Sequence, residues 1–192
     1  MGFAPAIDIF DGPREFAMVM PLVRGGELFE RLIARDAYDE ASARACVATL
    51  ARTVAFLHAH NVAHRDLKPE NMMLDAAGHL VLIDFGQCLD CALFELNGFR
   101  MPLPVQMPRG GAPGFLAPEV VTPRPGPRTV IDYKKNDDWA VGMLLYSLLA
   151  GPAATNPFSS GDDPRRFADA DYQPLDLGAG GGYSEGLAEV AR

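Results

Sequence analysis

The fold of this 192-residue chain is decided by the stretch His64-Arg65-Asp66-Leu67-Lys68-Pro69-Glu70-Asn71. The stretch holds a potential general base, a fixed cation and a potential metal ligand. A helical pattern precedes it and two short apolar runs follow it, which predicts a loop, where reactive side chains are commonly carried on a rigid scaffold. Asp66 and Asn71 are five positions apart, a spacing that a loop, and not one helix face, directs to a single point.

The two apolar runs after this loop cover residues 72–74 and 80–83, and residues 75–78, Asp-Ala-Ala-Gly, separate them. This pattern predicts a β-hairpin. Because a hairpin returns the chain to its starting point, Asp84 is expected to lie beside Asn71. Carboxylate and amide oxygens are suitable ligands for a hard cation such as Mg²⁺.

Several motifs together resemble the protein kinases, specifically the Ser/Thr kinases. The stretch 64–71 is similar to the kinase catalytic loop, and Asp-Phe-Gly at 84–86 to the metal-binding motif that follows it. Ala-Pro-Glu at 117–119 and the helix start at 137–142 follow in the expected order. The run 20–29 resembles the hinge, and its Gly-Gly-Glu-Leu-Phe is most similar to the calcium/calmodulin-dependent kinase group.

The resemblance implies an α+β fold: a mainly α-helical kinase C-terminal lobe with a remnant β-hairpin of the N-terminal lobe. We expect residues 1–23 to form that remnant and the hinge, residues 24–160 to form the C-terminal lobe, and residues 161–192 to be a Gly/Pro-rich, partly disordered tail. The β-like runs at 7–10 and 16–22 are preceded by no Gly-rich loop and no strand lysine, so most of the N-terminal lobe is expected to be missing.

Hydrophobic periodicity predicts three helices in the C-terminal lobe. Residues 27–33 are expected to form one or two turns. A longer helix is expected to open at Asp39 and to stop near Asn61, with a core-facing apolar stripe. Residues 139–150 form the most apolar run and are expected to be a buried helix that Gly151 ends.

The resemblance also implies the chemistry of the loop, the transfer of a phosphoryl group from ATP. Asp66 would accept or orient the proton of a substrate hydroxyl. Lys68 would place a cation against the transferring phosphoryl group, and Asn71 and Asp84 would hold Mg²⁺. The lysine two positions after the aspartate is the Ser/Thr version of this loop.

Further residues are assigned to nucleotide and substrate by the same resemblance. Met20 would control the depth of the adenine pocket, and the Pro21 carbonyl and Val23 N–H would pair with the adenine edge. Proline is compatible there because only its carbonyl is used. Glu27 would bind the ribose or a basic substrate side chain, and Glu70 could face a substrate arginine, so a protein substrate with basic residues near the acceptor is expected.

Structural roles are implied for three more residues. His64 and Phe85 are expected to pack against each other, and Asp137 is expected to anchor the loop backbone. Residues 87–116, where the family has its activation loop, contain no Ser, Thr or Tyr. Arg65, which in the family often grips a phosphate on that loop, would therefore pair with Asp90 or Glu95, or with no anion.

Composition excludes several classes of protein. The net charge of −8 and the pI of about 4.9 argue against a nucleic-acid-binding surface. No run reaches the ~18 apolar residues of a membrane span, and the N-terminus shows no signal-peptide pattern. Three cysteines do not predict a secreted disulfide framework, and the Cys88/Cys91 pair is too few ligands for structural zinc. We expect an intracellular, cytoplasmic protein.

Two functions stay open from the sequence. The first is a Ser/Thr protein kinase fragment that uses ATP and Mg²⁺, although the chain as written would be a weak catalyst, since one lost lysine–phosphate contact costs about 1.5–3 kcal/mol. The second is a catalytically dead, truncated pseudokinase that acts as a binding module. The four polar residues of the loop and hairpin favour the first, because a scaffold has no physical need for all of them. Substrate, regulator and oligomeric state do not follow from the sequence.

Overall fold

The computed structural model describes most of the chain up to residue 152. The described residues are 2–91, 95–96, 99–100, 111–121 and 131–152. The predicted tail at 161–192 lies outside them, as does the central part of the 87–116 segment. The proposed domain boundaries at 23/24 and 160/161 therefore stay predictions.

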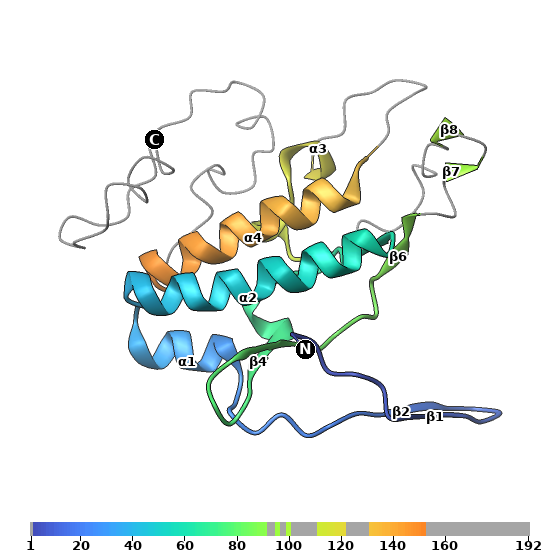
Figure 1. Cartoon of the computed structure of the whole chain (residues 1–192), viewed down its shortest axis with the longest axis horizontal. Coiled ribbons are helices and arrows are strands. Elements are labelled where there is room, and N and C mark those ends of the chain that lie inside the picture. Colours follow the sequence, from blue (N-terminus) through green and yellow to red (C-terminus); the bar gives the residue numbers. More distant parts are fainter. Residues whose placement is uncertain (1, 92–94, 97–98, 101–110, 122–130, 153–192) are drawn as a thin grey trace.

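Helices form the body of the described chain, as the resemblance implied. They are α1 (Leu28–Arg35), α2 (Glu40–Ala59), α3 (Pro118–Val121) and α4 (Tyr133–Ala150). Figure 1 shows α2 and α4 running side by side. Their apolar faces share one core with the hairpin of β4 (Met72–Leu74) and β5 (Leu80–Leu82). This core includes Leu28, Leu32, Leu50, Val54, Leu67, Met72, Leu80, Leu82, Leu144 and Leu148.

Helix α2 begins and ends where the sequence predicts. The Asp39 carboxylate accepts a hydrogen bond of 2.9 Å from the Ser42 N–H, which satisfies one of the unpaired amides of the first turn. Its apolar stripe is buried against the core. The chain leaves the helix through Asn61, whose φ of 60° lies in the left-handed region that asparagine tolerates.

Helix α4 begins earlier than predicted. The apolar run starts at Trp139, but the helix starts at Tyr133, because the Asp132 carboxylate accepts hydrogen bonds from the N–H groups of Lys134 (3.1 Å) and Lys135 (3.4 Å). The first two turns are polar in sequence, so their helical character is not visible as an apolar run. The helix ends at Gly151 with φ 90°, as expected.

The predicted hairpin after the loop is present. Strand β4 (Met72–Leu74) pairs antiparallel with β5 (Leu80–Leu82), with Met72 opposite Leu82. A short 3-10 turn, η1 (Pro69–Asn71), leads into it. The hinge segment docks on its outer edge, where the Gly25 N–H donates to the Leu74 carbonyl at 2.7 Å. A Cβ on Gly25 would collide with the backbone there, so the close approach requires glycine.

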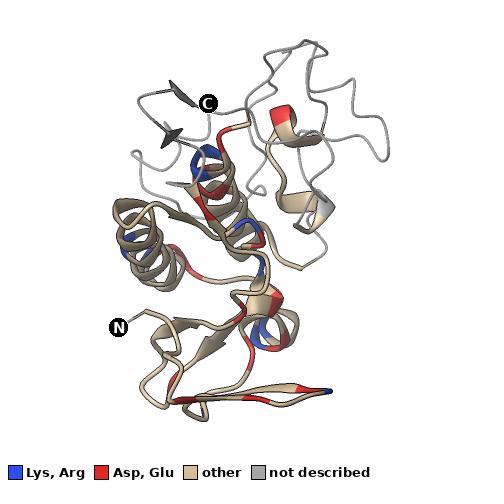
Figure 2. Ribbon diagram, turned by 90° about the vertical axis from the view of Figure 1, so that its right-hand side faces the viewer, with Lys and Arg blue, Asp and Glu red and all other residues tan. Residues whose placement is uncertain are grey.

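The N-terminal hairpin is also present, and its side chains are exposed. Strand β1 (Asp8–Asp11) pairs antiparallel with β2 (Phe16–Val19). Every residue of both strands is exposed, including Phe10 at 56% and Phe16 at 65%. Figures 1 and 2 show the hairpin projecting from the helical body.

Three pairings were not predicted. Strand β3 (Val62–Ala63), just before the loop, pairs antiparallel with β6 (Leu89–Asp90). The Phe3 backbone forms a parallel bridge to Leu82, and its ring lies against the rings of Phe56 and Phe85. A second two-stranded ladder joins β7 (Glu95–Leu96) to β8 (Phe99–Arg100). Among the described helices, none is both long and apolar enough to span a membrane.

Candidate functional site

The loop at 64–71 is fixed to α4 by one buried carboxylate, that of Asp137. Its Oδ2 accepts a hydrogen bond from the His64 N–H at 2.7 Å, and its Oδ1 accepts one from the Arg65 N–H at 2.8 Å. Asp137 is fully buried. Hydrogen bonds from ordered donors to a buried carboxylate are strong, so the predicted anchoring role of Asp137 is confirmed.

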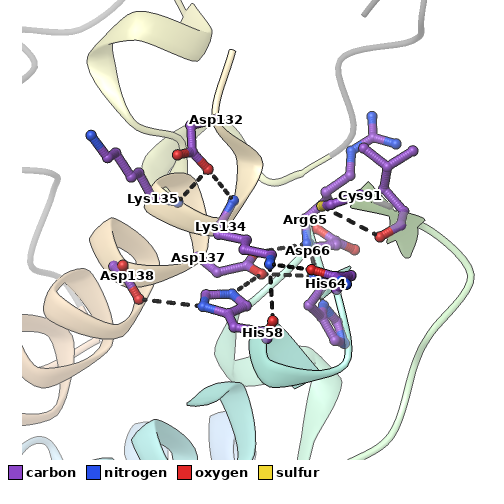
Figure 3. Close-up of polar contacts among 12 residues, drawn as sticks. His58, His64, Arg65, Asp66, Cys91, Asp132, Lys134, Lys135, Asp137 and Asp138 are labelled. Atoms are coloured by element: carbon purple, nitrogen blue, oxygen red, sulfur yellow. Dashed lines mark hydrogen bonds and ion pairs between the residues drawn. The ribbon is translucent and has the colours of Figure 1, made fainter. Parts of the chain in front are cut away.

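Two residues of this anchor were missed by the sequence analysis. The His58 Nε2 lies 3.0 Å from Asp137 Oδ2, and Lys134 Nζ donates to the His58 carbonyl (2.9 Å) and to Asn61 Oδ1 (3.0 Å). Figure 3 shows these side chains converging between the end of α2 and the start of α4. The contacts join residues more than 70 positions apart, so no local spacing indicates them.

His64 is a packed structural histidine, as predicted. Its ring is fully buried and meets the Phe85 ring edge-on, with centroids 5.2 Å apart and planes at 61°. Burial lowers its pKa, against the opposing charges of nearby carboxylates. A neutral ring has a free lone pair, and Nδ1 accepts a hydrogen bond of 3.3 Å from the Asp66 N–H.

Three of the predicted site residues meet directly. Asp66 Oδ2 accepts hydrogen bonds from Lys68 Nζ (2.8 Å) and from Asn71 Nδ2 (2.9 Å), and the same Asn71 nitrogen donates to the Asp66 carbonyl (2.8 Å). The hydrogen bond to Asp66 raises the pKa of Lys68, and the charges of Asp66, Glu70 and Asp84 raise it further, while burial opposes them. Lys68 is therefore a cation at neutral pH.

Asp84 lies next to this group without a hydrogen bond to it. The Ile83 N–H donates to the Asn71 carbonyl at 3.0 Å. Asp84 is the residue after Ile83, so the hairpin brings it close to Asn71. The side chain is exposed, and its Oδ1 accepts a hydrogen bond of 2.8 Å from the Gly86 N–H. Its charge contributes to the raised pKa of Lys68.

The oxygen atoms of this group fit a hard divalent cation. Asn71 uses its amide nitrogen toward Asp66, which leaves its amide oxygen as a ligand, and Asp66 Oδ1 is buried with no hydrogen-bond partner. Among the described residues, no group of three or more His, Cys, Asp or Glu gathers as an all-protein metal cage. Mg²⁺ needs no such cage, because it commonly uses one or two protein ligands and completes its shell with water and phosphate oxygens.

The predicted nucleotide residues of the hinge lie apart from the loop. Met20 follows β2 and is 39% exposed. Pro21 and Val23 line a hollow of about 290 Å³ together with Phe3 and Val81, and none of the four loop and hairpin residues lines it. Glu27 is exposed, and its backbone bridges to Met73. Glu70 is exposed on η1, close enough to Lys68 to act on its pKa.

The two cysteines of the C-x-x-C pattern are free thiols. Burial raises the pKa of Cys88 to about 12, with the charges of Asp137 and Asp84 adding to the effect. Burial also raises the pKa of Cys91. Since the thiolate is the nucleophile and the metal ligand, neither sulfur is activated for either role.

Comparison with known proteins agrees with these observations. Residues 5–173 match the family model of the protein kinase domain. Serine/threonine-protein kinase Sgk2 of Rattus norvegicus is 36% identical over 171 residues, which are 89% of this chain and 42% of that protein. Calcium/calmodulin-dependent protein kinase type II of Caenorhabditis briggsae is 39% identical over 155 residues, which are 79% of this chain and 26% of that protein.

The chain thus spans less than half the length of these relatives. The order of its motifs, the loop held by α4 and the match over most of its residues all point the same way. The chain belongs to the protein kinase domain family.

Proposed function

We propose that this chain carries the catalytic half of a Ser/Thr protein kinase, which transfers the γ-phosphoryl group of ATP to a protein hydroxyl. The observation that carries the proposal is the meeting of Lys68 and Asn71 at the Asp66 carboxylate, with distances of 2.8 and 2.9 Å to Oδ2, beside Asp84. A carboxylate, a cation and two oxygen ligands are the groups that phosphoryl transfer requires of a protein. Of the relatives named above, Sgk2 is named a serine/threonine-protein kinase and the other a protein kinase, which supports the same reaction.

Each residue then has one task. Asp66 accepts or orients the proton of the attacking hydroxyl, and its Oδ1 has no hydrogen-bond partner among the described residues. Lys68, already cationic, offsets the negative charge of the transferring phosphoryl group. Asn71 and Asp84 would hold Mg²⁺, which when bound neutralises charge on the phosphate oxygens. The hydrogen bonds among the first three residues keep them in place before substrate arrives.

The hinge residues would bind the adenine ring. The Pro21 carbonyl would accept and the Val23 N–H would donate, while Met20 would control the depth of the adenine pocket. Glu27 would contact the ribose or a basic substrate side chain. Support comes from their place at the end of β2, where the chain leaves the hairpin and enters the helical body.

The substrate would be a protein segment with basic residues near the acceptor hydroxyl. Glu70 is an exposed carboxylate within the 64–71 loop, and Glu27 is an exposed carboxylate whose backbone bridges to Met73 of the hairpin. An exposed ion pair is worth about 0.2–1 kcal/mol, so neutralising Glu70 should raise the KM of an arginine-containing peptide by roughly two- to fivefold. The KM of a peptide without arginine should not change.

The decisive experiment measures binding and not only turnover. Mg-ATP at one hundred times its Kd should stabilise the folded chain by about 2.7 kcal/mol, seen as a raised melting temperature. Asp84→Asn should weaken that effect roughly ten- to a hundredfold in Kd, since a hydrogen-bonded or ligating charge is worth about 1.5–3 kcal/mol. Asp138→Asn is the matched control, because it neutralises an exposed carboxylate outside the group.

Asp66→Asn separates binding from chemistry. It should leave the Mg-ATP shift in place and lower the transfer of labelled phosphate to a protein substrate by roughly 100- to 10,000-fold, the usual contribution of a general base. A melting temperature that stays the same when Mg-ATP is added would contradict the proposal.

A melting temperature that does not change with Mg-ATP would favour the alternative, a non-catalytic binding module. One observation supports it: the β1–β2 hairpin exposes Ile9, Phe10, Phe16 and Met18, an apolar surface of the kind that marks interaction sites.

A further inference from the structure

Arg65 occupies an unusual position in the 64–71 loop. Its φ of 72° lies in the left-handed region, which costs free energy for a residue with a Cβ. Its side chain is buried, with 6% of the residue exposed. A buried cation is expensive unless it has partners, so the conformation of the loop depends on what this guanidinium contacts.

The partner on α4 is an aromatic ring. The Arg65 guanidinium carbon lies 4.5 Å from the centroid of the Tyr133 ring, within the range of a cation–π contact. A nitrogen of the same group lies 3.4 Å from the Gln87 carbonyl oxygen. Tyr133 is itself buried in a second apolar cluster with Leu89, Leu116, Ala117 and Val120. The ring is therefore held in place by this cluster and not only by its contact with the cation.

The sequence that follows the Asp-Phe-Gly motif at 84–86, as far as residue 116, offers no hydroxyl for a covalent phosphate. Residues 87–116 contain no serine, threonine or tyrosine. Tyr133 itself is buried, with 4% of the residue exposed.

We propose that Tyr133 is a positioning residue, whose ring holds the Arg65 cation and so keeps the 64–71 loop assembled without any phosphorylation of the 87–116 segment. Asp137 fixes the Arg65 N–H, and Tyr133 fixes the other end of the same residue. Asp66 is the next residue in the chain, so the orientation of its carboxylate depends on the conformation of Arg65. The consequence for catalysis rests on the proposed function, but the positioning role does not.

Amide hydrogen exchange of the full chain tests the role without ATP. Tyr133→Phe keeps the ring, and Tyr133→Leu removes it. A cation–π contact of about 0.5–2 kcal/mol corresponds to roughly 2- to 30-fold faster exchange at the Arg65 and Asp66 amides in the leucine variant. The phenylalanine variant should exchange like the unchanged chain, as should the amides of the β4–β5 ladder in both variants.

Three results would overturn the proposal. The first is equal exchange in the leucine and phenylalanine variants, and the second is a uniform acceleration that includes the β4–β5 amides, since Tyr133 would then only fill the core. The third is a change in the exchange rate of the Arg65 amide after the chain is treated with a phosphatase.

A second pair of variants covers the case in which Tyr133→Leu does not fold. Arg65→Met removes the cation and should accelerate exchange at the Asp66 amide, whereas Arg65→Lys, which keeps a cation, should do so less. Exchange in Arg65→Met as slow as in the unchanged chain would show that the cation is not needed. Acceleration in Asp90→Asn or Glu95→Gln as large as in Arg65→Met would assign the cation to a carboxylate instead of the ring. Failure of the Mg-ATP experiment leaves all of these results intact.

Discussion

At the scale of single residues, the Asp137 carboxylate connects the most distant parts of the site. It accepts hydrogen bonds from the backbone N–H groups of His64 and Arg65, and it contacts the His58 ring nitrogen. Asp137 is fully buried. These hydrogen bonds fix the backbone of the loop to α4 through this carboxylate.

Removing that side chain should be costly. Asp137→Ala leaves two buried N–H groups unsatisfied, each worth about 1–3 kcal/mol, so we expect the free energy of unfolding to fall by roughly 2–5 kcal/mol. Urea denaturation measures it. The control is Asp138→Ala, an exposed neighbour, for which a change within about 0.5 kcal/mol is expected. Equal losses in the two variants would mean that the anchor contributes nothing specific.

His64 should give the stability a pH dependence. Burial lowers its pKa in the folded chain, while the unfolded chain titrates near its ordinary value of about 6.5. Below that pH the unfolded state takes up a proton that the folded state does not, so stability is full above about pH 6.5 and is lost as pH falls toward the lower folded pKa.

The measurement is the free energy of unfolding between pH 7.5 and 5 (roughly the window set by these values). His64→Phe keeps an aromatic edge against Phe85 and should lose less stability on acidification than the unchanged chain. His79→Asn, at an exposed histidine, serves as the control and should follow the unchanged chain. Parallel curves for all three proteins would rule out His64 as the source.

At the scale of elements, each long helix begins at an aspartate. Asp39 caps α2 and Asp132 caps α4, each accepting hydrogen bonds from amides of the first turn. The cap of α4 also sets the position of Tyr133, the first helical residue, and of Asp137 one turn later. The start of α4 is thus a part of the site and not only a helix end.

The cap of α2 offers a clean test at this scale. Asp39→Ala should lower the free energy of unfolding by about 0.5–2 kcal/mol, because the Ser42 N–H loses its acceptor. Asp39→Asn can still accept that hydrogen bond and should restore most of the loss. Thermal or urea unfolding followed by circular dichroism distinguishes the two, and an asparagine variant as unstable as alanine would contradict the capping role.

At the scale of the whole molecule, stability comes from the helical body and not from the N-terminal hairpin. Leu144 is fully buried in the core that α1, α2 and α4 share, whereas both strands β1 and β2 are exposed throughout. A two-stranded hairpin is at best marginally stable alone.

We therefore expect Leu144→Ala to cost about 2–5 kcal/mol, the range for a large-to-small change in a packed core. Phe10→Ser, on the exposed hairpin, should change the free energy of unfolding by less than about 0.5 kcal/mol. Both are measured by denaturant unfolding of the same preparation. A large loss in the serine variant would show that the hairpin is covered in solution.

Much of the fold and of the site could be predicted from local patterns. The apolar periodicity of α2, the hairpin of β4 and β5 and the order of the kinase-like motifs all depend on neighbours in the chain, which sequence displays directly. The sequence also placed Asp66, Lys68 and Asn71 in one loop, and a hairpin that returns Asp84 to it. The start of α4 was missed because its first turns are polar and bury Asn136 and Asp137, against the pattern of an apolar run.

The sequence by itself determined the family, the elements of the helical body and the residues of the loop, because periodicity and motif spacing are local properties. Only the tertiary structure decided what holds that loop: His58 and Lys134 at the junction of α2 and α4, and the Tyr133 ring over Arg65. These contacts join residues far apart in the chain, and they exist because packing α4 against α2 brings a buried carboxylate and a buried ring to the same backbone. The spacing of residues in the sequence does not indicate these contacts.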